Sequence, residues 1–126
     1  MSNLFIAIAA LNGFVAVACG AFAAHGLKAR LPADLLAIFQ TGVQYQMYHA
    51  LALLAVGLVG LQLGSSGLLR ASGFLFIAGI IIFSGSLYLL SLTGTRWLGA
   101  ITPIGGVAFL AGWVLLGAAV LRQANP

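Results

Sequence analysis

The residues best equipped for chemistry are two histidines, and one of them lies inside an apolar stretch. His49 ends the segment 39–49 (FQTGVQYQMYH), which carries dense polarity into a hydrophobic run. His25 stands in a glycine-bounded connection upstream. An ionisable side chain inside lipid is costly and is a functional candidate by default. Segment 39–49 is therefore the first candidate for a functional site.

The polar side chains of this segment gather on one half of a helix. Phe39 and Val43 fall on the opposite half, where Gln46 is the single polar residue. We expect the polar face to point into the helical bundle or a wet crevice, away from acyl chains. Its members, together with His25 from the preceding connection, form the predicted binding or structural cluster: His25, Gln40, Thr41, Gln44, Tyr45, Tyr48 and His49.

These residue types are compatible with ligand binding, catalysis, transport or structural hydrogen bonding. If His25 and His49 meet at one membrane face, two imidazoles are the axial ligands that a haem iron takes. A zinc site needs about four ligands, and the histidines with Asp34 and Cys19 do not make one. No activated nucleophile or intramembrane carboxylate is apparent, which disfavours catalysis and proton-coupled transport. Structural hydrogen bonding is the favoured interpretation, with a crevice for a lipid headgroup, a quinone-like ring or a small polar ligand second.

Composition places this site in a membrane. Of 126 residues, 63% are hydrophobic and 5% are charged, so lipid must be the solvent for most of the surface. The net charge of +4 is spread over separate loops, which suits lipid headgroups and excludes nucleic acid. The sequence predicts an all-α integral membrane four-helix bundle with short loops.

We expect one transmembrane domain over residues 1–126, with spans at about 4–24, 44–63, 72–92 and 100–121. Gly26 suits the end of the first helix, and Pro32 suits the start of the next, which predicts an amphipathic lead-in to the second span. His49 would then lie shallowly, on the order of 8 Å inside the hydrocarbon edge. Trp113 is expected at mid-depth as a packing residue.

Loop charges and small residues complete the pattern. Charged and aromatic residues in the first and third loops are predicted to be interface anchors: Lys28, Arg30, Asp34, Arg96 and Trp97. Small residues within the spans are predicted to allow close helix packing: Gly13, Gly20, Gly85, Gly106 and Gly112.

Three segments resemble a known family. Residues 20–27 (GAFAAHGL), 39–50 (FQTGVQYQMYHA) and 96–106 (RWLGAITPIGG) are similar to the domain-of-unknown-function 423 family, which is related to eukaryotic transmembrane protein 256. The resemblance covers nearly the whole chain. It implies a compact, multi-span helical protein of the bacterial inner membrane and supplies no activity.

We therefore expect a non-catalytic binding or accessory module, in contact with membrane lipid, that assembles with itself or within a larger membrane complex. The first alternative is a lipid-, quinone-like- or haem-binding protein that uses the polar cluster of His25 and His49. The second is a small-solute permease or a membrane enzyme. We expect no metal and no cofactor, with haem as the one alternative.

Overall fold

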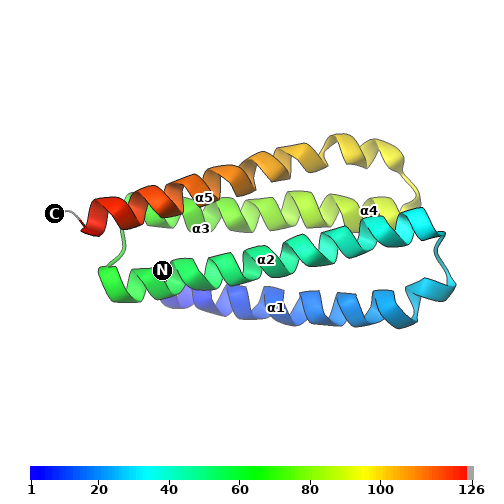
Figure 1. Ribbon diagram of the computed structural model, residues 1–126, viewed down its shortest axis with the longest axis horizontal. Coiled ribbons are helices and arrows are strands. Elements are labelled where there is room, and N and C mark those ends of the chain that lie inside the picture. The colour runs from blue at the N-terminus through cyan, green and yellow to red at the C-terminus, as the bar shows by residue number, and fades with distance from the viewer. Residues whose placement is uncertain (125–126) are drawn as a thin grey trace.

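The computed structural model describes residues 1–124, the last of them by its backbone alone, and these residues form antiparallel helical spans (Figure 1). The elements in chain order are α1 (Ser2–His25), η1 (Leu27–Ala29), α2 (Ala33–Leu63), α3 (Gly67–Gly79), η2 (Ile80–Ser84), α4 (Gly85–Thr93), η3 (Arg96–Ala100) and α5 (Thr102–Ala124). Within the described residues, four helical stretches are long and apolar enough to cross a membrane. The predicted all-α four-helix membrane fold is confirmed.

The helices end where local chemistry requires it. Pro32 is the N-cap of α2, so the helix begins where the sequence predicts. Gly64 leaves α2 with a φ of 87°, a conformation that costs glycine little. Ser66 then caps α3 by accepting a hydrogen bond from the Leu69 N–H at 3.2 Å. These tight turns return each span directly beside the preceding one.

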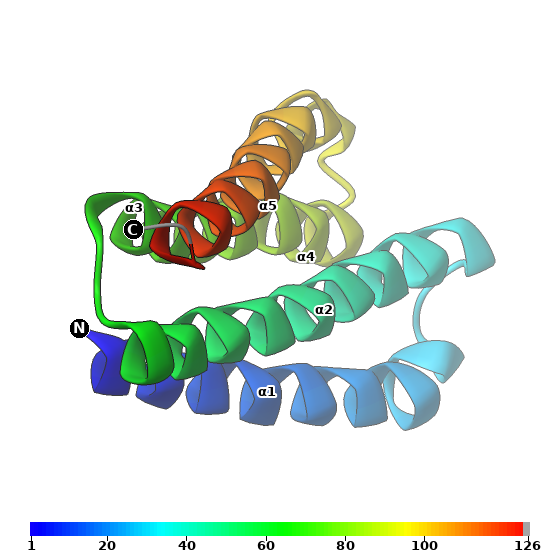
Figure 2. The ribbon, with the colours of Figure 1, turned by 60° about the vertical axis from the view of Figure 1, so that its left-hand side comes forward.

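The spans form two layers, with α1 and α2 in one and the third span with α5 in the other (Figure 2). α1 packs mainly along α2, and α5 packs mainly on α3 and η2. Contacts of α2 with α3, η2 and α4 join the layers. The second and third spans are therefore the centre of the molecule, and α1 and α5 are its outer helices.

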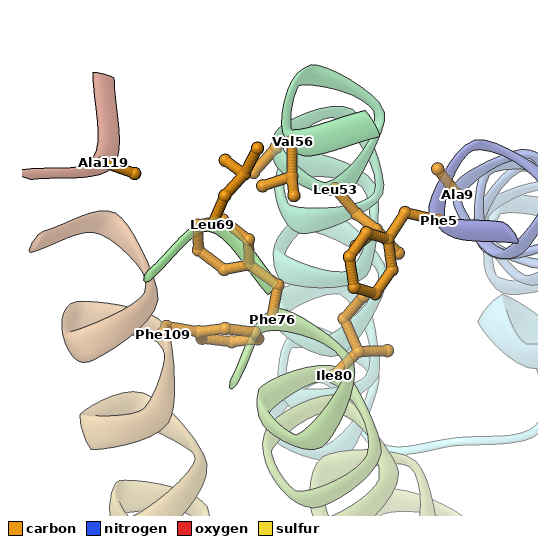
Figure 3. Packing of buried hydrophobic residues seen from close by; sticks show 10 residues of the cluster. Phe5, Ala9, Leu53, Val56, Leu69, Phe76, Ile80, Phe109 and Ala119 are labelled. Carbon is orange, nitrogen blue, oxygen red and sulfur yellow. The ribbon is translucent and has the colours of Figure 1, made fainter. Parts of the chain in front are cut away.

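Apolar side chains from all four spans fill the space between the layers (Figure 3). The labelled members are Phe5 and Ala9 of α1, Leu53 and Val56 of α2, Leu69 and Phe76 of α3, Ile80 of η2, and Phe109 and Ala119 of α5. Phenylalanine rings fit against glycines of neighbouring helices. A Cβ on Gly79 would lie 2.4 Å from Phe109, and one on Gly112 would lie 2.7 Å from Phe76.

The third span contains a π-helical segment that the sequence did not predict. η2 separates α3 from α4, where an unbroken helix was expected over residues 72–92. Its Phe83 backbone approaches Gly105 of α5 so closely that a Cβ there would lie 2.5 Å from the Phe83 nitrogen. Ser84 of η2 donates a buried hydrogen bond to the Gly42 carbonyl of α2 at 2.7 Å. The irregular segment thus contacts both neighbouring helices.

Only some of the glycines predicted to allow close helix packing lie against another helix. Gly20, Gly106 and Gly112 would each bring a Cβ within 4 Å of another element. Gly13 and Gly85 have no such neighbour among the described residues.

Candidate functional site

His49 lies near the middle of α2 and is buried, with 5% of its surface exposed. Its Nδ1 is 2.8 Å from the Tyr45 carbonyl oxygen, and its Nε2 is 3.1 Å from Nε1 of Trp113 on α5. An indole N–H only donates, so Nε2 must accept and Nδ1 must carry the proton. Both ring nitrogens of a neutral imidazole are thus satisfied within the chain.

Aromatic rings surround this imidazole. Phe109 of α5 stacks on it with ring centroids 3.5 Å apart and an interplanar angle of 8°. Tyr45 packs against Phe83 with centroids 4.6 Å apart, and Phe76 packs edge-on against Trp113. The aromatic cluster therefore joins α2, α3, η2 and α5.

An open groove of about 410 Å³ runs beside the aromatic cluster, between α2 and α5. Its lining consists of Tyr45, His49, Phe83, Pro103, Gly106, Val107, Phe109, Leu110 and Trp113. Trp113 Nε1 donates to His49 Nε2, and His49 Nδ1 donates to the Tyr45 carbonyl, so none of these nitrogens is free to bind a ligand. The hydroxyl of Tyr45, by contrast, has no hydrogen-bond partner within residues 1–124. The groove surface is therefore almost entirely apolar and largely aromatic.

A second polar link crosses the bundle through Gln46. The Tyr88 hydroxyl on α4 donates to Gln46 Oε1 at 2.6 Å, and Gln46 Nε2 donates to Asn12 Oδ1 on α1 at 3.0 Å. Asn12 Nδ2 in turn donates to the Ile8 carbonyl at 2.9 Å. This directional chain of hydrogen bonds connects three helices and leaves the buried Gln46 amide paired on both sides.

The expectation that the polar face of segment 39–49 points inward is wrong in part. Gln40, Gln44 and Tyr48 are exposed on the outside of the bundle, and the inward polar residue is Gln46. Thr41 donates to the backbone carbonyl four residues earlier at 3.0 Å. The reason is that the glycine-bearing side of α2 packs against its neighbours, and Gln46 shares that side.

The structure does not bring His25 and His49 together. His25 ends α1 at one end of the bundle, where η1 leads into α2. His49 lies farther along α2 from that end, by about 24 Å of helical rise. The two imidazoles therefore offer no bis-histidine arrangement for a haem. In the described part of the chain, no three His, Cys, Asp or Glu residues lie close enough to hold a metal.

The predicted anchors lie at the His25 end of the bundle. Arg96 pairs with Asp34 at 2.7 Å, which links the third loop to the start of α2. Lys28 and Arg30 are exposed in the first loop, and Trp97 is exposed in η3.

Asn12 and Tyr88 are not predicted from the sequence as site residues, and Trp113 is predicted only as a packing residue. Asn12 and Trp113 are isolated polar groups in apolar runs, and Tyr88 lies among serines without a spacing that singles it out. A detectable signal did exist on α2, where Gly42, Gly57 and Gly60 are all buried. Small residues mark the contact face of a membrane helix.

Four apolar spans in the described part of the chain, joined by hydrogen bonds between buried polar side chains, define a small polytopic α-helical membrane protein. A family model described as "Protein of unknown function (DUF423)" matches residues 19–106, and the chain belongs to this family. The resemblance predicted from the sequence is confirmed.

Curated relatives match nearly end to end. The chain is 47% identical over 120 residues to UPF0382 membrane protein YwdK of Bacillus subtilis (strain 168), covering 95% of this chain and 98% of that protein. It is 48% identical over 124 residues to UPF0382 membrane protein SERP0230 of Staphylococcus epidermidis, covering 98% and 99%. A UPF0382 membrane protein of Haemophilus influenzae is 47% identical over 116 residues, covering 92% of each chain. No solved structure matches this chain.

Proposed function

We propose that this chain is a non-catalytic protein of the bacterial cytoplasmic membrane that binds a lipid-soluble molecule in the groove between α2 and α5. The ligand is a flat, mostly apolar ring with one polar substituent, as in the quinone class. Bacterial relatives named membrane proteins and the helical spans support the location.

The observation that carries this proposal is an almost entirely apolar groove lined by aromatic rings, beside a tyrosine, Tyr45, whose hydroxyl has no hydrogen-bond partner within residues 1–124. Ligand sites are typically about 300–1,000 Å³ and combine apolar walls with a few polar groups that fix orientation. The groove has about 410 Å³, and rings of Tyr45, Phe83 and Trp113 line it. Offset or edge-on stacking on such rings favours a planar ligand. The Tyr45 O–H can donate one hydrogen bond to a ring carbonyl.

The geometry favours binding over catalysis. A general base needs a nitrogen within reach of its substrate, and both nitrogens of His49 are already engaged. An anionic ligand is also disfavoured, because no charged side chain lines the groove.

Tryptophan fluorescence tests the proposal, because Trp113 lines the groove and Trp97 lies in η3 at the end of the bundle. In lipid nanodiscs, a Trp97→Phe protein is titrated with a short-chain benzoquinone. We expect saturable quenching of Trp113. In the Trp113→Phe protein, which retains Trp97, quenching should rise linearly with quinone partitioning. Equal, unsaturable quenching in both proteins would contradict the proposal.

The hydroxyl is tested with two tyrosines one helical turn apart. Tyr45→Phe should weaken binding about threefold to tenfold, the value of one hydrogen bond. Tyr48→Phe is the matched control, because Tyr48 lies outside the groove lining. An unchanged affinity of the Tyr45→Phe protein would remove the proposed role of the hydroxyl.

A further inference from the structure

The outer side of α2 carries a continuous ridge of exposed side chains. Its first four members recur every three or four residues and the last follows two turns later, so they lie on one side of the helix. We call this set the α2 ridge; it consists of Gln40, Gln44, Tyr48, Leu51 and Leu58. Tyr48 is 53% exposed and Leu51 is 57% exposed.

The polar part of the α2 ridge lies deep in the membrane. Tyr48 is the middle residue of α2, and the Asn12–Gln46 hydrogen bond joins the middle of α1 to the middle of α2. The Asp34–Arg96 ion pair marks one end of the bundle. With the bundle centre at the bilayer midplane, Gln44 lies about 6 Å along the helix from that plane, whereas the hydrocarbon extends about 15 Å to each side. This differs from the expected span over 44–63, which places Gln44 at the hydrocarbon edge and His49 shallowly, because α2 begins at Ala33 and its middle packs against the middle of α1.

An exposed carboxamide at this depth needs a partner. The Gln44 side chain makes no hydrogen bond to any described residue. Acyl chains supply neither donors nor acceptors, so an unpaired amide facing lipid is strongly unfavourable. Glutamine is too short to reach the headgroups from there. Whatever covers Gln44 must both donate and accept a hydrogen bond.

We infer that a second copy of this chain covers the α2 ridge. Two copies inserted in the same direction are related by a twofold axis along the membrane normal, so each ridge residue faces its own counterpart. A carboxamide is self-complementary, because its N–H donates to the partner's oxygen while its oxygen accepts from the partner's N–H. At the twofold axis, the Gln44 carboxamide therefore both donates and accepts a hydrogen bond. Leu51 and Leu58 continue the contact at the spacing of seven that parallel helix pairs use.

Self-association in vesicles tests the hydrogen bond. Copies labelled with donor or acceptor fluorophores are diluted with lipid, and energy transfer gives the dissociation constant. Gln44→Leu should raise this constant about 10-fold, which is about 1.4 kcal/mol. Gln62→Leu is the matched control, because Gln62 is exposed at the far end of the same helix, outside the hydrocarbon; its constant should change less than twofold. Circular dichroism spectra and detergent-unfolding curves check that the Gln44→Leu protein folds normally.

Cysteine crosslinking in native membranes tests the geometry. In a Cys19→Ala background, Leu51→Cys and Leu58→Cys, which keep the Gln44 carboxamide, should form disulfide-linked dimers on oxidation. Val114→Cys lies at similar depth on the exposed face of α5 and should remain monomeric. Equal crosslinking at Val114→Cys would overturn the inference. So would an absence of energy transfer at every dilution, an unchanged constant for Gln44→Leu, or crosslinking of the α2 ridge only to a different protein.

Discussion

Removing Gln46 should be more damaging than removing either of its partners, because it is the middle of the hydrogen-bond chain. Gln46 accepts from Tyr88 at 2.6 Å and donates to Asn12 at 3.0 Å. Hydrogen bonds between membrane helices are worth about 0.6 kcal/mol on average and up to about 1.7 kcal/mol. Tyr88→Phe and Asn12→Leu each remove one interhelical bond and should each cost about 1 kcal/mol of unfolding free energy.

Gln46→Leu removes both bonds, which leaves the Tyr88 hydroxyl with Cys19 alone and the Asn12 amide oxygen without a partner. We expect a loss of about 2–3 kcal/mol, since an unsatisfied buried group is penalised beyond the lost bond. The triple replacement of Asn12, Gln46 and Tyr88 by Leu, Leu and Phe leaves nothing stranded. It should therefore be more stable than Gln46→Leu alone.

The measurement is equilibrium unfolding in mixed micelles with rising denaturing detergent, followed by tryptophan fluorescence. The reasoning is refuted if Gln46→Leu is no less stable than Tyr88→Phe. It is also refuted if the triple variant is less stable than Gln46→Leu, because that order means that the three side chains act independently.

Three further outcomes follow from the packing and the turns, and the same unfolding assay measures each. Gly105→Ala should lose about 1–3 kcal/mol because its Cβ meets backbone across the helix pair, whereas Gly117→Ala, with open space around it, should be neutral or slightly more stable. Gly94→Ala should lose about 1–2 kcal/mol, because φ is 73° at this residue, and a loss below about 0.3 kcal/mol would speak against the left-handed cap. Asp34→Asn should lower the stability only slightly, and the effect should fade with salt, because the ion pair with Arg96 is exposed; a large, salt-independent loss would contradict this.

The spans were predictable because the length of an apolar run and the chemistry of its ends are local properties. Pro32 and Gly64 mark the limits of α2 without reference to any other helix. The π-helical segment η2 was not predictable in this way. It depends on Phe83 packing over Gly105, which belongs to another span.

The site was only partly predictable, because helical periodicity groups residues by face without saying which face meets lipid. Polarity argued for burying Gln44, but the inward face of α2 is set by close packing at Gly42 and Gly57. His49 was found because imidazole is rare in lipid. Its partner Trp113 was not, because indole is common in membrane helices and its N–H acquires meaning only beside an acceptor.

The pairing of α1 with α2 has a consequence for biosynthesis. These helices are made first, and as a hairpin they already contain the Asn12–Gln46 hydrogen bond. Gln46 receives its second partner when Tyr88 is inserted, and His49 receives Trp113 only with the last span. A chain that lacks α5 would thus hold in the bilayer an imidazole with one unpaired nitrogen, so the last span completes the hydrogen bonding of the second.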